Sequence, residues 1–246
     1  MDATEIFVVI AVALFASIAQ GLAGFGFVVI AVPFFLLILN VEDAVVVATL
    51  LTIASVALMA IRLRRAVCWL PVGRLVVGSF AGMPVGILVL LFAPEDALRI
   101  IVGVSAIAMA TWLATGPEIR AAGVRSDLLV GAVSGVLRTS TGMSGPPVVV
   151  YLQGQRYAPR QFRASLAVFL LVTSVISLGA FAGAGVVSAE ALMLAAIGLP
   201  AVFVGNRAGD RLVQRVEGKF FHRLVLLLLV APAPWAQRHS LHHRRS

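Results

Sequence analysis

One arginine, Arg138, lies inside an apolar stretch and is followed by three hydroxyl-bearing residues and then by Ser144. An arginine at the centre of a membrane helix costs roughly 2.5–3.5 kcal/mol, so it usually faces a cavity or an opposite charge. No aspartate or glutamate lies in the core of a predicted helix to supply that charge. We therefore expect Arg138 to attract an anion, with Thr139, Ser140 and Ser144 orienting it through hydrogen bonds.

Two other interpretations of these residues stay open. Arg138 follows Asp127 by only about ten positions, and its long side chain could extend to water at the membrane surface instead. Serine and threonine hydroxyls also commonly donate to their own helix backbone, which would leave Thr139 and Ser140 without a binding role.

Glycines interrupt the apolar sequence at residues 20–26 (QGLAGFG) and again, 118 positions later, at residues 138–147 (RTSTGMSGPP). Backbone groups freed at such breaks are tolerated at membrane depth only where they line a wet cavity or meet other protein groups. The half-helix that starts after a break presents partial positive charge, which suits an anion. A lone glycine pair would more often serve close helix crossing, but two breaks in corresponding places favour a binding site. The further predicted binding residues in the breaks are Gln20, Gly24, Phe25, Gly26, Gly142 and Gly145.

The composition places the chain in a lipid bilayer. Of its 246 residues, 61% are hydrophobic and 12% are charged, which is too apolar for a soluble surface. The long apolar runs lack the alternation of a β-barrel, so we predict an all-α integral membrane protein with about eight membrane helical elements. A single cysteine, and histidines only from position 222 onward, predict neither a metal nor a cofactor. The net charge of +8 comes from short loops rather than a basic face, so no nucleic acid is expected.

The apolar runs divide the chain into two halves. The first repeat covers residues 1–115, a connection on the cytoplasmic side covers 116–127, the second repeat covers 128–230, and 231–246 is a basic, disordered tail. The predicted apolar segments are 6–20, 27–39, 44–61, 69–93, 97–115, 128–137, 148–153, 164–187, 191–206 and 220–230. Glycines four residues apart predict close helix packing by Gly78, Gly82 and Gly86, and by Gly179 and Gly183.

Each half begins with a glycine-broken hairpin that returns to its starting side, and three crossings follow in the first half. An odd number of crossings inverts the second half, which is the inverted-repeat arrangement of many secondary transporters. At the offset of 118, Gln20 falls on Arg138 and Gly24 on Gly142.

Loop charges orient this arrangement. With the N-terminus outside, the inner loops hold 14 of the 19 basic residues, as the positive-inside rule requires. These residues are Arg62, Arg64, Arg65, Arg74, Arg120, Arg125, Arg156, Arg160, Arg163, Arg207, Arg211, Arg215, Lys219 and Arg223.

The two broken segments, GLAGFGFVVIAVP and GVLRTSTGMSGPPVVVYL, resemble the paired glycine-rich motifs of the sulfite exporter TauE/SafE family. The similarity covers roughly residues 5–225. It implies a multi-pass permease of the bacterial inner membrane that moves sulfite, organosulfonates or related anions. The family motifs would place around the translocation site Gly24, Phe25, Gly26, Pro33, Gly142, Ser144, Gly145, Pro146 and Pro147.

We therefore predict a secondary permease for small anions that works by alternating access and is not an enzyme. A channel-like anion pathway and a non-transporting scaffold or inactive truncated product are the alternatives. The last segment, 220–230, would span only ~17 Å as a helix, whereas the hydrocarbon core is ~30 Å thick. This short length favours the inactive alternative. The sequence leaves open which anion is transported, in which direction and with which coupling ion. The oligomeric state is also left open, and a homo-oligomer is one of the alternatives.

Overall fold

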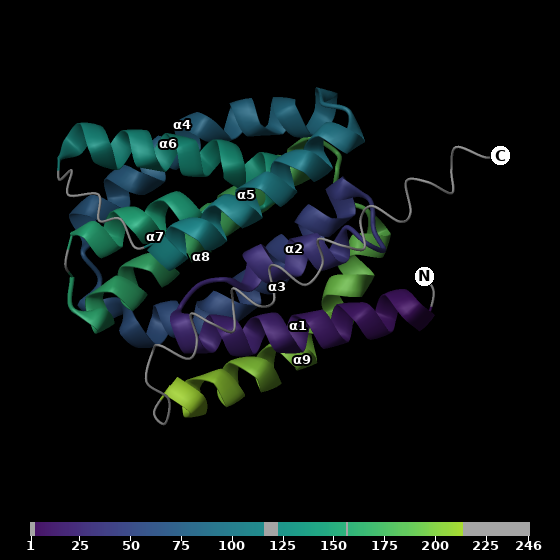
Figure 1. The fold of residues 1–246 in the computed structure, drawn as a ribbon, viewed down its shortest axis with the longest axis horizontal. Helices are drawn as coiled ribbons and strands as arrows, with labels where there is room; N and C mark the ends of the chain where they lie inside the picture. The colour runs from purple at the N-terminus through teal and green to yellow at the C-terminus, as the bar shows by residue number, and fades with distance from the viewer. Residues whose placement is uncertain (1–2, 116–122, 156, 214–246) are drawn as a thin grey trace.

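The computed structural model describes residues 3–115, 123–155 and 157–213 (Figure 1). Their regular structure is entirely helical, which confirms the all-α prediction. The elements are α1 (Ala3–Ala23), α2 (Phe27–Phe35), α3 (Val41–Leu63), the short 3-10 helix η1 (Arg64–Ala66), α4 (Trp69–Phe92), α5 (Glu95–Thr115), α6 (Val124–Thr141), α7 (Gly145–Gly154), α8 (Pro159–Gly183) and α9 (Ala189–Val213). The predicted segment 220–230, the tail 231–246 and most of the predicted connection, 116–122, lie outside the described residues.

Among the described helices, five are long and apolar enough to cross a bilayer. They are α1, α3 together with η1, α4, α8 and α9, with apolar stretches of 19 to 26 residues. A helix needs about 20 residues to cross a hydrocarbon core of about 30 Å. The much shorter α2 and α7 follow the two breaks, as the sequence predicts.

Local signals explain where these helices start and end. Asn40 caps α3 by accepting a hydrogen bond from the backbone N–H of Asp43, at 2.8 Å from nitrogen to oxygen. The α1 helix ends before Gly24, and α6 ends before Gly142, and both glycines have positive φ angles, 84° and 77°. Such left-handed backbone is readily adopted by glycine, so each break starts where the sequence supplies one.

Helices from opposite halves of the chain pack in pairs. In Figure 1, α1 and α9 lie side by side along the lower edge, while α4 and α6 lie along the upper edge. Between the two pairs, α3 packs against α8. The first helix of each half therefore packs on a later helix of the other half.

Glycines set the closeness of the α4–α6 pair. A Cβ at Gly82 would overlap the backbone carbonyl of Ala132, and one at Gly135 would overlap that of Ser79. Gly78 and Gly86 face α6 in the same way, which confirms the predicted packing role of this ladder. Gly179 and Gly183 are exposed, with nothing within 4 Å of an added Cβ, so the same prediction is wrong for them within the described chain.

The α1–α9 pair is built similarly. A Cβ at Gly205 would lie 2.5 Å from the carbonyl oxygen of Leu14, and one at Gly209 would lie 2.6 Å from that of Ile18. Small residues on both helices thus allow their backbones to approach closely.

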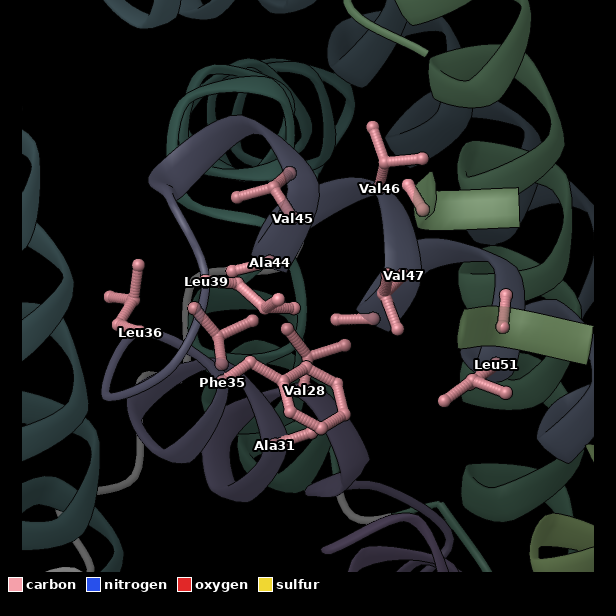
Figure 2. Close-up of a cluster of buried hydrophobic side chains, with 14 of the residues drawn as sticks. Val28, Ala31, Phe35, Leu36, Leu39, Ala44, Val45, Val46, Val47 and Leu51 are labelled. Atoms are coloured by element: carbon pink, nitrogen blue, oxygen red, sulfur yellow. The ribbon is translucent and has the colours of Figure 1, made fainter. Parts of the chain in front are cut away.

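An apolar core joins the short helix α2 to its neighbours. Figure 2 shows part of this core, where side chains of α2, among them Val28 and Phe35, meet side chains of α3, among them Val45 and Val47. Phe35, Val45 and Val47 are completely buried, so α2 is enclosed by protein on this side.

Both breaks are shorter than the sequence predicts. The α1 helix continues to Ala23, so Gln20 and Gly21 are helical and only residues 24–26 interrupt the chain. The α6 helix continues to Thr141, so Arg138, Thr139 and Ser140 are helical and only residues 142–144 interrupt the chain. The hydroxyls of Ser140 and Thr141 donate to the carbonyls four residues earlier, which keeps this polar run compatible with a helix.

Candidate functional site

A small cavity lies where the two breaks meet. We call it the central cavity, and its lining residues are Gln20, Phe25, Gly26, Phe27, Val28, Val29, Thr52, Arg138, Met143, Ser144, Gly145 and Leu170. Its volume is about 20 Å³, measured as the space open to the centre of a water-sized sphere. One water molecule needs roughly 10–15 Å³ on this measure, so the cavity is almost filled by protein in this conformation.

Most residues that line the central cavity form pairs with the same spacing in the sequence. Apart from Val28 and Val29, every lining residue has a partner in the lining that is 118 positions away in the chain. The pairs are Gln20 and Arg138, Phe25 and Met143, Gly26 and Ser144, Phe27 and Gly145, and Thr52 and Leu170. The two halves thus contribute corresponding positions to one cavity.

Arg138 is fully buried, with 0% of its surface exposed. Its guanidinium donates from Nε to Ser177 Oγ at 3.2 Å, from Nη2 to Ser174 Oγ at 2.6 Å and from Nη1 to the carbonyl of Gly142 at 3.2 Å. No carboxylate of the described chain forms an ion pair with it. The side chain therefore does not extend to surface water, and its charge has only neutral partners.

The two serines that hold Arg138 were missed by the sequence analysis. Ser174 and Ser177 lie three residues apart on the apolar helix α8 and thus share a face. That spacing in an apolar helix is a signal that could have found them, because paired hydroxyls at membrane depth usually meet a polar partner.

Gln20 occupies the position in the first half that corresponds to Arg138. Its Nε2 donates to the carbonyl of Gly24 at 3.2 Å, and its Oε1 accepts from the backbone N–H of Phe27 at 3.0 Å. Gln20 and Arg138 thus make the same contact, a donation to the carbonyl four residues further on, at the start of a break. Gln20 additionally joins the end of α1 to the start of α2.

Ser144 supplies a hydroxyl to the lining. It is 1% exposed and precedes α7, and its Oγ has no hydrogen-bond partner in the described structure. The lining contains the first residue of α2, Phe27, and the first residue of α7, Gly145. Two helix N-termini with their partial positive charge therefore meet Arg138 at a cavity lined by no acidic residue.

Four of the ten predicted binding residues lie outside the lining, as do Pro33 and Pro147 of the family motifs. The side chain of Pro146 lies outside the described part of the structure. Thr139 donates to the carbonyls of Met83 and Gly135, at 2.8 and 3.1 Å, so its hydroxyl serves the α4–α6 contact. Ser140 donates to its own helix. Gly24 and Gly142 shape the breaks and provide carbonyl acceptors without lining the cavity themselves.

A buried carboxylate near the start of α6 was also missed. Asp127 lies in the first turn of α6 rather than in a loop, and is 3% exposed. Its Oδ1 accepts a hydrogen bond from the Tyr151 hydroxyl of α7 at 2.7 Å, and its Oδ2 lies 3.4 Å from Arg74 Nη1 of α4. These contacts join residues far apart in sequence, so local patterns could not reveal them.

The described part of the chain is all-helical, has five helices long and apolar enough to cross a membrane, and holds a positively charged cavity at two helix breaks. This is the architecture of a membrane transporter. The chain belongs to the sulfite exporter TauE/SafE family, whose model matches residues 9–233. It is therefore a multi-pass membrane protein of a transporter family and not an enzyme.

A probable sulfite/organosulfonate exporter TauE from Cupriavidus necator is similar to this chain. The two are 26% identical over 193 residues, which cover 76% of this chain and 75% of the relative. No solved structure matches the chain.

Proposed function

We propose that the protein is a secondary permease that moves sulfite, organosulfonates or related small anions across the bacterial inner membrane by alternating access. The observation that carries this proposal is the central cavity, where the fully buried Arg138 has no acidic partner and the Ser144 hydroxyl has no partner at all within the described chain. Membership of the family and the printed name of the Cupriavidus relative support sulfur-containing anions as the substrate class.

The anion would replace the neutral partners of Arg138. An anionic oxygen accepts a stronger hydrogen bond from a guanidinium than a serine hydroxyl or a backbone carbonyl does. Ser144 would donate its free hydroxyl. Backbone donors would come mainly from α2, because Pro146 and Pro147 have no N–H to offer at the start of α7.

Inverted repeats would explain how the two halves meet. The α1 helix packs on α9 while α6 packs on α4, and the cavity lining pairs residues at an offset of 118. Both observations support two structurally equivalent halves within residues 1–115 and 128–230, related by an axis through the central cavity.

The distribution of charges supports an N-terminus outside. Ion pairs join Arg62 and Arg163 to Asp210, and Arg74 to Asp127, at the ends of helices that the charge rule assigns to the inside. The opposite helix ends carry Asp43, which accepts a hydrogen bond from Ser188.

Alternating access would enlarge the central cavity and open it to each side in turn. Its volume of about 20 Å³ supports a contracted conformation with room for little more than one water molecule. The glycine-packed pairs α1–α9 and α4–α6 would move as units, with the breaks as hinges, because the positive-φ glycines there can change conformation at low cost.

The test is flux of sulfite and methanesulfonate into proteoliposomes containing wild type, Arg138→Gln or Arg65→Gln. A charge-assisted hydrogen bond is worth about 1.5–3 kcal/mol, so Arg138→Gln should lower flux at limiting substrate by about 10- to 100-fold. Arg65→Gln removes the same charge from the exposed η1 and should leave flux unchanged. Equal flux in all three proteins would contradict the assignment of the site.

Counterflow separates a carrier from a channel-like pathway. Vesicles preloaded with unlabelled sulfite should transiently accumulate labelled sulfite above its external concentration. With the membrane potential clamped at zero, a channel would give no such accumulation, and its flux would rise linearly with the gradient.

A further inference from the structure

A second cavity lies where α3 and α9 end together, close to the end of α1. We call it the end cavity, and it has a volume of about 30 Å³ on the same measure as the central cavity. The polar residues in its lining are Gln20, Ser55, Arg62, Asn206, Arg207 and Asp210. Its location, at helix ends that carry many arginines, places it between the central cavity and one surface of the bundle.

The charges of the end cavity are unequal. Asp210 is its acidic residue, with Oδ2 at 3.5 Å from Arg62 Nη1 and Oδ1 at 3.8 Å from Arg163 Nη2 of α8. Arg207 is exposed and forms no ion pair within the described chain. Positive charge is therefore in excess, and the carboxylate of Asp210 occupies a position that another anion could take.

A buried hydrogen-bonded pair forms part of the wall. Ser55 Oγ donates to Asn206 Oδ1 at 3.0 Å, and Asn206 Nδ2 donates to the carbonyl of Ser55 at 2.9 Å. These two hydrogen bonds join α3 to α9. The wall of the end cavity therefore includes a buried polar contact and not surface side chains alone.

Gln20 lines both cavities. Its side chain is held across the first break by the hydrogen bonds to Gly24 and Phe27. Arg163 reinforces the same wall, because its Nη2 donates to the carbonyl of Gly21 at 2.9 Å. The end of α1 therefore forms part of the wall of both cavities.

We propose that the end cavity is an inner intake site, where the anion binds to Arg62 and Arg207 in competition with Asp210 before it passes Gln20 to the central cavity. This inference rests on the proposed function and on the inner placement of these helix ends.

The test compares sulfite uptake by inverted membrane vesicles, which present the inner face, with uptake by right-side-out vesicles. Partly exposed charge pairs are worth up to about 1 kcal/mol, so Arg62→Gln and Arg207→Gln should raise the KM at the inner face by about twofold to fivefold without lowering kcat. Asp210→Asn removes the competing carboxylate and should lower the same KM by a similar factor. The KM at the outer face should not change.

Arg65→Gln is the matched control. It removes a positive charge from the same end of the molecule but from outside the cavity lining, so its KM should equal that of wild type. An unchanged KM in both arginine variants, an equal rise in Arg65→Gln, or a rise in Asp210→Asn would overturn the intake site.

A direct binding measurement tests the intake site without relying on transport. Purified Arg138→Gln protein should retain weak binding of radiolabelled sulfite, and adding Arg207→Gln should weaken that binding further by about twofold to fivefold. Absence of residual binding in Arg138→Gln would refute the intake site. Failure of the proposed function would look different, since wild type itself would then carry neither sulfite nor methanesulfonate in either kind of vesicle.

Discussion

Ser134 and Ser144 are buried serines whose hydroxyls have no hydrogen-bond partner within the described chain. Comparing them distinguishes a serine that binds the anion from one that only packs. Both are at most 1% exposed, but only Ser144 lines the central cavity. We expect Ser144→Ala to raise the KM for sulfite by about tenfold or more, because a hydrogen bond to a charged group contributes about 1.5–3 kcal/mol. Its stability should not fall, since the lost hydroxyl had no protein partner.

Kinetics in proteoliposomes and the thermal unfolding midpoint in detergent measure these two effects. Ser134→Ala is the control and should change neither the KM nor kcat. Equal transport by the two variants would show that Ser144 does not contact the anion.

At the scale of helices, the glycines of α4 and α6 determine how closely the two helices pack. Gly82→Ala would push a methyl group into the carbonyl of Ala132, and overpacking of this kind costs about 1–3 kcal/mol. Gly179→Ala places the same methyl group in open space on α8 and should be neutral or slightly stabilising, because alanine favours helix more than glycine does. Unfolding midpoints in detergent compare the two, and a similar loss in both would refute the close contact.

The anchor of α7 gives a second prediction at this scale. Tyr151→Phe removes the hydrogen bond to the buried Asp127, which should cost about 1–3 kcal/mol of stability and lower sulfite flux, because α7 carries Gly145 at the cavity. Tyr157→Phe is the control, since the Tyr157 hydroxyl has no hydrogen-bond partner within the described chain. Thermal unfolding and flux are measured together, and an unaltered Tyr151→Phe protein would show that α7 is held by packing alone.

Much of this arrangement follows from the sequence. Apolar runs located the helices, and glycines located both breaks, because hydrophobicity and positive φ angles are local properties. Arg138 was predictable as a buried cation because its cost in a membrane is large. The extension of α6 through Thr139 and Ser140 was not predictable, because it depends on the hydrogen bonds that their hydroxyls donate to the helix's own carbonyls.

The sequence did not reveal the contacts of Asp127 and Gln20 either. Asp127 falls in a predicted loop, and only the folded chain places Tyr151 of a later helix within hydrogen-bond distance of it. The sequence predicts Gln20 as a binding residue. Only the structure shows that its amide already donates to Gly24 in the break and accepts from Phe27 at the start of α2.

For the whole molecule, the orientation in the membrane can be read from its single cysteine. Cys68 lies between η1 and α4, at the end that the charge rule places inside, and is partly exposed. A membrane-impermeant maleimide should label Cys68 in inverted vesicles and not in intact cells. In a Cys68→Ser background, Ala189→Cys at the opposite end should give the reverse pattern. Labelling of Cys68 from outside would invert the proposed orientation.

The exchange of partners between the halves has a consequence for biosynthesis. The α1 helix is complete at Ala23, but α9, on which it packs, starts only at Ala189. Translation at about 5–20 residues per second leaves α1 without this partner for roughly 10 to 40 seconds. During that time the face of α1 that packs against Gly205 and Gly209 must be covered by lipid, the insertion machinery or a temporary helix contact. The nascent first half therefore cannot reach its native packing before the second half emerges from the ribosome.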